Sequence, residues 1–151
     1  MIIRKAKIKD AKSLNNLLTL LIRDEKQYDN NIDENFVVTN MYENYIEDPK
    51  RCILVAEDNE KIIGYIYGYL NDADPTLNNR LALLDALYVD ENYRKQGIAD
   101  SLIKNFKEWV ISNNVKIIEV GVCSENINAK HLYNKHGFNT VKETLICEIN
   151  N

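Results

Sequence analysis

Residues 84–99 read LDALYVDENYRKQGIA, an apolar strand pattern followed by a polar turn and the small-residue start of a helix. The first turn of a helix carries unpaired backbone N–H groups and a partial positive charge, so it can hold a phosphate group. Gly97 lets the backbone approach such a ligand closely, and Ala99 keeps the first helical turn uncrowded. The stretch therefore predicts a central strand that leads into an anion-binding helix N-terminus.

The patterns on either side of this stretch predict a mixed α/β sheet with helices on both faces, built from about six to seven strands and about four helices. Apolar runs and alternation predict strands over residues 2–8, 52–57, 61–70, 81–89, 116–123, 138–141 and 143–149, with 52–57 and 61–70 forming a hairpin. Helical spacing predicts a helix capped by Asp10, a weaker helix over 33–47, a helix from Gly97 to about residue 112, and a short helix capped by Asn126 and ended by Gly137.

Three tyrosines, Tyr65, Tyr67 and Tyr69, share one face of the second hairpin strand, because side chains alternate along a strand. The ladder fits either the wall of a cleft for a substrate or, more commonly, a half-buried face under a helix. Cys52, Cys123 and Cys147 form no CxxC pair and lie in strand-like apolar runs, which favours buried thiols. His131 and His136 have no cysteine or carboxylate at ligand spacing, so no metal site is expected.

Length and composition predict one domain over residues 1–151. Because no apolar run could span a bilayer and the N-terminus lacks a signal-peptide pattern, we expect a cytoplasmic protein with no membrane partner. The net charge of −4 argues against nucleic acid as a partner. Between residues 24 and 48, eight acidic side chains and a single lysine would either form a solvated helical face or attract a cationic substrate.

A second motif, NINAKHLYNKHGF, covers residues 126–138. With the first it resembles the two signatures of the GNAT family of N-acetyltransferases, Arg/Gln-x-x-Gly-x-Gly/Ala and Asn…Ala-x-x-Leu-Tyr-x-x-x-Gly-Phe, and about 30 residues with one helix and one strand separate them. The resemblance runs from the hairpin to Phe138, whereas the first 50 or so residues agree in layout only. It implies the GNAT-like acyl-CoA N-acyltransferase fold, with a mostly antiparallel central sheet, and acetyl-CoA as co-substrate without a metal.

The same resemblance implies a set of cofactor contacts. Backbone N–H groups of six residues would surround the pyrophosphate: Arg94, Lys95, Gln96, Gly97, Ile98 and Ala99. The backbone of Leu87 and Val89 would pair with the pantetheine arm, and Asn126 would contact the cofactor at the mouth of the second helix. Without a ligand, Gly97 and Ala99 would only serve a tight turn. Asp100 either opposes the phosphates, which would weaken binding, or points to solvent.

For catalysis, the resemblance places Tyr133 at the thioester sulfur, where its hydroxyl would stabilise the departing thiolate; otherwise Tyr133 is a core aromatic beneath Phe138. A lysine-type amine with a pKa near ~10.4 is mostly protonated at neutral pH, so the attacking amine needs a base or a site that lowers its pKa. Asp85 and Glu119 lie in apolar contexts that can raise a carboxylate pKa, and both are candidate bases beside a water relay. Some family members carry a carboxylate two residues beyond Glu119, where this chain has Gly121.

The expected function is transfer of an acetyl group from acetyl-CoA to a primary amine, by direct attack in a ternary complex. The acceptor would be a small molecule or a peptide, and the acidic stretch favours a cationic one. A homodimer is compatible with the resemblance, since similar proteins often pair. The alternative from another class is a catalytically inactive sensor or regulatory module of the same fold that binds acyl-CoA. A P-loop enzyme is not indicated, because the chain has no Gly-x-x-x-x-Gly-Lys-Ser/Thr motif.

Overall fold

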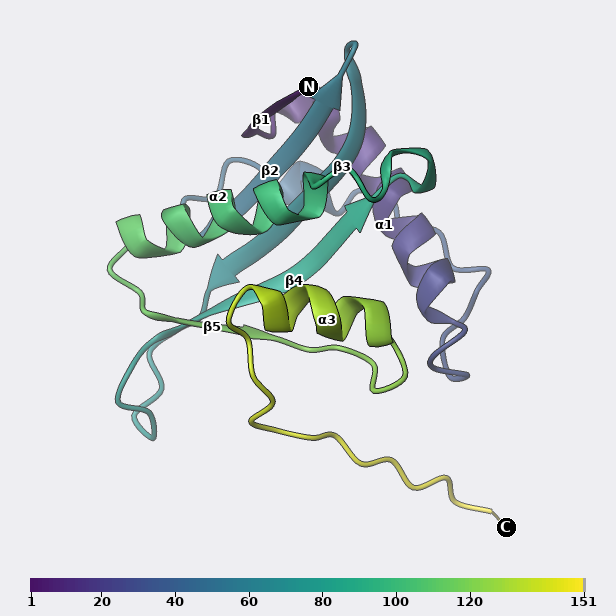
Figure 1. Cartoon of the computed structure of the whole chain (residues 1–151), viewed down its shortest axis with the longest axis vertical. Helices are drawn as coiled ribbons and strands as arrows, with labels where there is room; N and C mark the ends of the chain where they lie inside the picture. The colour runs from purple at the N-terminus through teal and green to yellow at the C-terminus, as the bar shows by residue number, and fades with distance from the viewer. Residues whose placement is uncertain (151) are drawn as a thin grey trace.

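A computed structural model describes residues 1–150 as one five-stranded sheet with helices on both faces (Figure 1). The strands are β1 (Ile2–Lys5), β2 (Arg51–Asp58), β3 (Lys61–Leu70), β4 (Leu81–Val89) and β5 (Ile117–Val120). The α-helices are α1 (Ala11–Glu25), α2 (Ile98–Ser112) and α3 (Ile127–Lys135), and short 3-10 turns cover η1 (Ile8–Asp10), η2 (Tyr42–Asn44) and η3 (Glu91–Tyr93).

The strands lie in sequence order across the sheet, β1-β2-β3-β4-β5. The first three pairings are antiparallel and only β4 and β5 run parallel. A parallel pair needs a crossover connection, and α2 supplies it. The predicted mixed, mostly antiparallel sheet with helices on both faces is therefore confirmed, with five strands and three α-helices in the described residues rather than six to seven strands and four helices.

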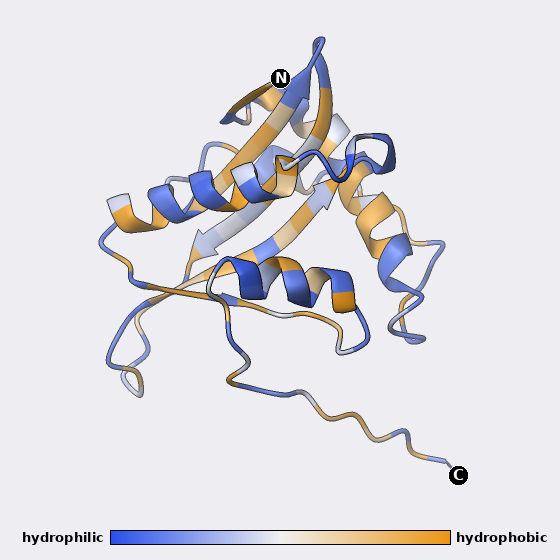
Figure 2. Cartoon of the chain, viewed as in Figure 1, coloured by the Kyte–Doolittle hydropathy of each residue, from blue (hydrophilic) through white to orange (hydrophobic). Residues whose placement is uncertain are grey.

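Two apolar layers hold the helices to the sheet. On one face, α2 buries Leu102, Ile103 and Phe106 against β2, β3 and β4. A Cβ at Gly68 would lie 2.3 Å from the Phe106 ring and 2.5 Å from the Leu83 carbonyl oxygen, so a glycine is needed there for this close packing. On the other face, α1 buries Leu14, Leu17 and Leu18. Figure 2 shows hydrophobic stretches along this helix.

The tyrosine ladder of β3 belongs to the α1 face. Tyr65 and Tyr67 are 0% and 1% exposed, and the ring of Tyr42 packs edge-on against both, with centroids 5.5 and 5.4 Å away. The hydroxyls of Tyr42 and Tyr65 lie 2.9 Å apart, so the buried polar ends satisfy one another. Burial under α1 and η2 is therefore confirmed for Tyr65 and Tyr67, and Tyr69 packs beside them in a partly buried position.

The start of α1 differs from the sequence-based expectation in one detail. Asp10 occupies the N-cap position of α1, but its side chain makes no cap hydrogen bond there. The carboxylate instead accepts from the Arg4 guanidinium at 2.7 Å and from the Lys7 N–H at 2.8 Å. Because Arg4 also donates to Glu57 at 3.2 Å, this one guanidinium joins β1, β2 and the start of α1.

The predicted helix over 33–47 is wrong, because only the 3-10 turn η2 forms within it. Side chains of α1 take the backbone groups that a helix would use: Thr19 Oγ1 accepts the N–H of Val38 at 3.0 Å, and Asn15 Oδ1 accepts the N–H of Tyr42 at 3.2 Å. Asn40 adopts a φ of 53°, which a right-handed helix excludes. Tertiary contacts therefore overrode the local helical pattern.

The predicted strands over 138–141 and 143–149 are also wrong, because no regular element follows α3 in the described residues. A strand makes its hydrogen bonds with a neighbour, and residues 139–150 leave the body without one (Figure 2). The expectation of buried thiols also fails in part: Cys52 is buried, Cys123 is partly exposed, and Cys147, which lies in this segment, is exposed. Burial raises the pKa of Cys52 to about 12.

Candidate active site

The second half of β4 has no strand partner on the side away from β3. The pairing of β4 with β5 covers Leu81–Leu84, whereas the pairing with β3 continues to Val89. The Asp90 N–H donates to the Ile63 carbonyl at 2.8 Å, so the Val89 carbonyl points away from β3, where it accepts the Arg94 Nε–H at 2.8 Å. Since polar groups alternate along a strand, those of Leu87 share this free side with Val89.

Directly beyond this edge, the loop between β4 and α2 presents its backbone N–H groups. Lys95 and Gly97 adopt left-handed φ angles of 63° and 79°, and a Cβ at Gly97 would meet nothing within 4 Å, so backbone conformation rather than space favours glycine there. Among the turn and loop hydrogen bonds of the described residues, none has a backbone N–H group of residues 94–99 as its donor. Free N–H groups at the start of a 15-residue helix form an arrangement that suits an anion.

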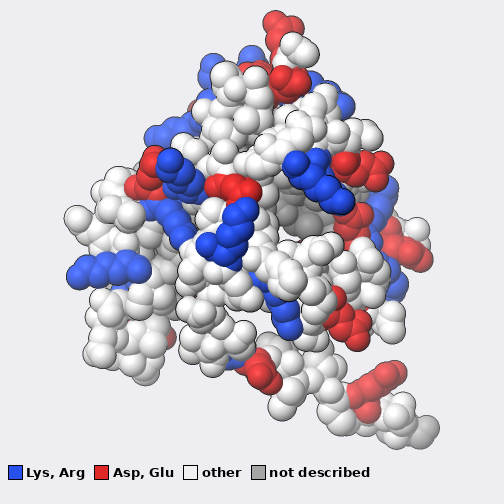
Figure 3. Space-filling view, viewed as in Figure 1, with Lys and Arg blue, Asp and Glu red and all other residues white. Residues whose placement is uncertain are grey.

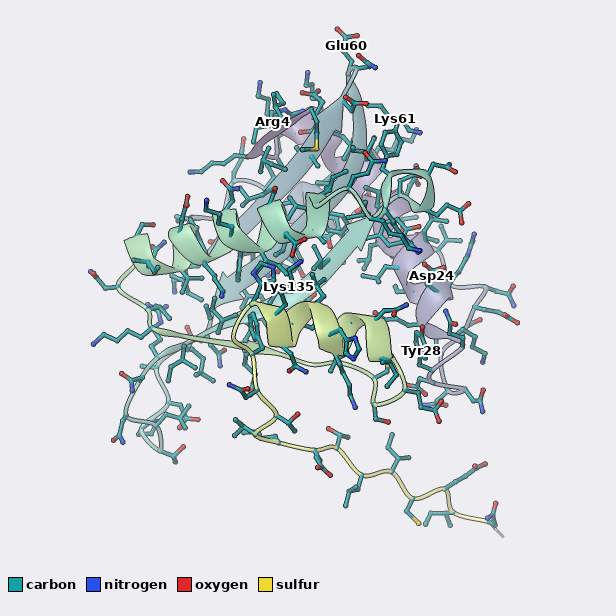
Figure 4. The ribbon with its side chains drawn as sticks, in the orientation of Figure 1. Arg4, Asp24, Tyr28, Glu60, Lys61 and Lys135 are labelled. Carbon is teal, nitrogen blue, oxygen red and sulfur yellow. The ribbon has the colours of Figure 1, made fainter. Side chains whose placement is uncertain are left out.

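The Arg94 side chain turns away from these N–H groups and toward α1. Its guanidinium pairs with Asp24 at 3.2 Å and lies 5.2 Å from the centre of the Tyr88 ring. Figure 3 shows a hollow beside the β4–α2 loop, bounded by basic and acidic side chains, and Figure 4 places Asp24 on α1 at this side of the molecule. The loop would therefore meet a ligand mainly through its backbone.

Asp100 takes neither of the two orientations expected for it. Its carboxylate pairs with Lys135 Nζ at 2.9 Å and with His136 Nε2 at 2.7 Å, at the end of α3. Hydrogen bonds from Lys135 and His136 hold the pKa of Asp100 below its usual value. Figure 4 shows Lys135 between α2 and α3. Asp100 therefore joins the two helices that carry the sequence motifs.

Helix α3 starts as the sequence predicts. Asn126 is its N-cap, and the Asn126 side-chain oxygen accepts the Ala129 N–H at 3.1 Å. Tyr133, one helical turn after Ala129, packs on the core of the α2 face. Its ring meets the Phe138 ring edge-on, with centroids 5.5 Å apart. Of the described residues, none hydrogen-bonds the Tyr133 hydroxyl, and no fully buried side-chain polar atom is left without a partner, so this hydroxyl is not completely enclosed. Burial of the ring and the charge of Glu25 raise the pKa of Tyr133 to about 12.

Asp85 occupies a β-bulge. Tyr67 pairs with Ala86 and Gly68 pairs with Leu84, so Asp85 is an extra residue with no partner on β3. A bulge turns two successive side chains to one face, and Ala86 lies on the α1 face. The Asp85 carboxylate is open to solvent, yet desolvation by its surroundings raises its pKa, with the charge of Arg51 opposing the shift.

Glu25, the last residue of α1, is a site residue that the sequence reasoning missed. Partial burial, followed by the charges of Asp29, Asp85 and Asp24, raises the pKa of Glu25. Its charge in turn raises the pKa values of Tyr133 and Cys123, so it lies near the residues of the second motif. A signal was present: Glu25 stands four residues after Leu21 and three after Ile22, on the apolar stripe of the helix.

Glu119 lies apart from this group. It stands opposite Leu83 in the paired part of β4 and β5, its side chain is 44% exposed, and it pairs with Lys142 at 3.3 Å. The structure therefore brings Asp85 into the neighbourhood of Glu25 and places Glu119 beside the C-terminal segment. In the part of the chain that the structure describes, no group of three or more histidine, cysteine or acidic residues could hold a metal ion. Across residues 1–150, no helix has the length and apolarity needed to cross a membrane.

The structure combines a mixed sheet in which β4 and β5 pair only as far as Leu84, a loop of exposed residues that leads from β4 into α2, and a tyrosine on α3. Such an arrangement can accept an extended anionic ligand. The model of the Acetyltransferase (GNAT) family matches residues 15–138. The chain belongs to this family.

Named relatives agree with this assignment. The chain is 27% identical over 110 residues to human N-acetyltransferase 8, which covers 73% of this chain and 48% of that protein. It is 26% identical over 124 residues to the streptothricin acetyltransferase of Escherichia coli, covering 70% and 71%. A mutant of the BH1408 protein from Bacillus halodurans superposes with a TM-score of 0.89 at 25% identity, over 99% of this chain and all of that one. The chain spans about half the length of the human relative.

Proposed function

We propose that residues 1–151 act as a single N-acetyltransferase domain that moves the acetyl group of acetyl-CoA to a primary amine by direct attack in a ternary complex. The observation that carries the proposal is the row of free N–H groups from residue 94 to residue 99, directly beyond the free edge of β4. The row suits a pyrophosphate, and a strand edge suits an amide-containing arm, which can hydrogen-bond to it as another strand would. Membership of the GNAT family adds acetyl-CoA as the ligand that has both parts.

In this proposal, three segments of the chain contact the cofactor. The N–H groups of residues 94–99 hold the pyrophosphate, and the backbone of Leu87 and Val89 pairs with the pantetheine arm. The Asn126 oxygen is engaged in capping α3, so its amide NH₂ is the group available to the cofactor. Asp100 does not oppose the phosphates, because Lys135 forms an ion pair with its carboxylate and His136 is hydrogen-bonded to it.

Tyr133 is the proposed partner of the departing sulfur. The amine nitrogen attacks the thioester carbon, the carbon–sulfur bond breaks, and the sulfur leaves as a thiolate that must gain a proton. A thiol pKa of about 8.5 lies well below the pKa of Tyr133, about 12, so full proton transfer from this hydroxyl is uphill. The hydroxyl therefore stabilises the thiolate by hydrogen bonding, and the proton arrives late or through water.

The base that receives the amine proton is proposed among the carboxylates of the α1 face. Asp85 and Glu25 both have raised pKa values and come from facing elements, and the charge of Asp85 contributes to the raised pKa of Glu25. A carboxylate with a raised pKa is a better proton acceptor and stays partly ionised near neutral pH. Glu119, paired with Lys142, is the weaker candidate, and a water relay through Asp85 is the alternative to direct transfer.

A cationic amine is the acceptor class we propose, either a small molecule or a peptide. Asp24, Glu25 and Asp29 stand at the end of α1, beside the bulge that carries Asp85. Negative charge there attracts a cation and can also bind its ammonium group. Nucleic acid and membrane lipid, both anionic, are disfavoured at the same place.

The test uses two measurements on the full chain. Thermal melting with acetyl-CoA reports binding, and thiol release with a panel of amines at several pH values reports turnover. A rise in Tm together with thiol release on a cationic amine is the expected result. A rise in Tm without turnover on any amine would instead indicate the inactive acyl-CoA-binding module. No rise in Tm would exclude both functions.

The matched variants for this test are Gly97→Val and Gly121→Val. Valine at a φ of 79° is strained and reshapes the loop of N–H groups, whereas Gly121 has no positive φ and no atom within 4 Å of an added Cβ. We expect the rise in Tm with acetyl-CoA to shrink for Gly97→Val and to persist for Gly121→Val. Equal responses of the two variants would remove the loop from the binding site.

A further inference from the structure

The side chain of Arg51, the first residue of β2, is held in place by four neighbouring side chains. Its Nε–H donates to Asp48 at 3.1 Å, and its Nη1 donates to the Tyr67 hydroxyl. Its guanidinium carbon lies 3.9 Å from the centre of the Tyr45 ring and 5.5 Å from the centre of the Tyr69 ring. Ion pairs near the surface contribute little to stability, so stability alone is a weak reason to fix an arginine in this way.

The fixed guanidinium still has hydrogen-bond donors to offer. Arginine carries five N–H groups, and the contacts of Arg51 use one on Nε and one on Nη1. Of the described residues, none accepts a hydrogen bond from Nη2, and no fully buried side-chain nitrogen is left without a partner, so Nη2 is not completely enclosed. A planar guanidinium with free donors suits a carboxylate, because charge-assisted hydrogen bonds between the two are strong.

Arg51 lies on the same face of the sheet as Asp85. Side chains alternate along a strand, and Ile53, two positions after Arg51, belongs to the core of the α1 face. On the neighbouring strand, Tyr67 accepts from Arg51 and pairs with Ala86, which stands next to Asp85 in the bulge of β4. The charge of Arg51 also acts on the pKa of Asp85, in agreement with this placement.

The region proposed for the acceptor therefore contains charges of both signs. Asp85 and Glu25 supply the negative charge that attracts an ammonium group, and Arg51 supplies a positive group on the other side of β3. An acceptor with positive charges only, such as a polyamine, would be repelled by the guanidinium. An acceptor that carries both an amine and a carboxylate has a partner for each of its charges.

We propose that the acceptor is a free amino acid, with its carboxylate bound by Arg51 and its α-amino group directed toward Asp85. This assignment rests on the proposed acetyl transfer and narrows its acceptor from cationic amines in general to amines that carry a carboxylate. The bond changes are those of that reaction, with the α-amino nitrogen as the attacking atom. Arg51 determines specificity, while Tyr45 and Tyr69 position its guanidinium. Because the side chain is ordered before the acceptor arrives, binding loses little of its rotamer freedom.

Acceptor pairs that differ only in the carboxylate test the assignment on the full chain. Thiol release from acetyl-CoA is measured with basic, acidic and apolar L-amino acids and with the matching α-amides. We expect kcat/KM to be roughly tenfold or more higher for the acid, mainly through a lower KM, because only the acid pairs with the guanidinium. The amide has the lower amine pKa and so more neutral amine at a given pH. Without recognition of the carboxylate, the amide would therefore react faster.

Variants of two adjacent residues locate the preference. Arg51→Gln should lower kcat/KM for the acid roughly tenfold or more and change it little for the amide, whereas Arg51→Lys, which keeps the charge without the planar fork, should retain part of the preference. The matched control is Lys50→Gln, at a 64% exposed side chain, which should leave the ratio unchanged. The ratio compares two substrates of one sample, so a merely structural role of Arg51 would lower both values alike.

The outcomes separate this assignment from the acetyl transfer itself. A wild-type chain that acetylates the amides as well as the acids, or Arg51→Gln with an undiminished preference for the acids, would overturn the amino-acid acceptor alone. An equal loss of preference in Lys50→Gln and Arg51→Gln would also overturn it. No thiol release with any amine would contradict the acetyl transfer, and the amino-acid acceptor would fall with it.

Discussion

The packing of side chains differs between two parts of the chain, residues 1–115 and residues 116–150. Each part contains one of the two sequence motifs. The first part contains every buried side chain of the described residues, including all the buried members of both apolar layers. From residue 116 to residue 150 no side chain is buried to that degree, and α3 contains none. The motif with the loop is therefore rigidly supported, whereas the motif with Tyr133 rests on a few contacts.

Because of this difference in packing, only a few contacts hold the two parts of the proposed site together. Between the parts lie the ion pair of Asp100 with Lys135, the hydrogen bond between Asp100 and His136, the hydrogen bond from Lys107 to the His136 carbonyl, and the packing of Tyr133 and Phe138 on the α2-side core. Few buried contacts mean low local stability, which is typical of elements that move when ligands bind. We therefore expect α3 to open more readily than α2.

The largest expected effect compares two phenylalanines across this division. Phe106 is 0% exposed and stacks on Trp109, whereas Phe138 is only partly buried. Phe106→Ala should lower the free energy of unfolding by about 3–5 kcal/mol, because it leaves a cavity under α2. Phe138→Ala should cost about 1–2 kcal/mol, since its site is half open. Urea unfolding measures both, and equal losses would mean that the second part is packed as firmly as the first.

The second-largest expected effect is a loss of catalytic rate from a change at Tyr133, in the loosely packed part. Tyr133→Phe removes only the hydroxyl, so it should lower kcat by roughly 100-fold, or about 2.7 kcal/mol, with little change in the KM for acetyl-CoA. The reason is that the hydroxyl acts on the sulfur in the transition state rather than on the bound substrate. An unchanged Tm should accompany the loss of kcat. Full activity in Tyr133→Phe would remove this residue from the mechanism.

A smaller effect compares two glycines. Gly68→Ala places a methyl group 2.3 Å from the Phe106 ring and 2.5 Å from a carbonyl oxygen, which should cost about 1–3 kcal/mol. Gly121→Ala meets no atom within 4 Å and needs no left-handed φ, so it should change stability by no more than about 0.5 kcal/mol. Thermal melts of both proteins test the pair. A cost at Gly121 equal to that at Gly68 would contradict the packing difference.

The smallest effect belongs to Asp100, whose carboxylate joins the two parts at the surface. Its pKa is lowered in the folded protein, so its ion pairs stabilise the fold above the ordinary aspartate pKa of about 3.9, and this contribution is lost as the pH falls through the lowered value. Asp100→Asn should therefore cost at most about 1 kcal/mol at neutral pH and nothing near pH 2. Hydrogen exchange of α3 amides measures the change, with Asp72→Asn, at a 94% exposed carboxylate, as the control.

Features that depend on neighbours in sequence were predictable, and features that depend on a distant partner were not. The run from Leu84 to Ala99 specified strand, turn and helix locally, and Asn126 specified its own cap. The helix over 33–47 failed because Asn15 and Thr19, far away in sequence, take its N–H groups. The strands after residue 138 failed because alternation signals a strand without supplying a neighbour.

The residues of the candidate site also divide into those that a local sequence motif predicts and those that depend on a partner far away in the sequence. The loop and Tyr133 carry motifs, whereas Glu25 is recognised only once α1 is seen to end beside Asp85. The bulge at Asp85 depends on the register with β3 and leaves no local trace in the sequence of β4. Conversely, the carboxylate of Asp100 looked problematic in the sequence only because its partners at the end of α3 lie 35 and 36 positions further on.

The bulge also shows what folding does not require of β4. On the two sides of Asp85, Leu84 stays opposite Gly68 and Ala86 stays opposite Tyr67. A chain lacking this single residue could keep every one of these pairs, and each later side chain would still face the layer it faces now. Asp85 is thus one residue more than the pairing of β4 with β3 needs, so its carboxylate is free to serve what the strand does rather than how it folds.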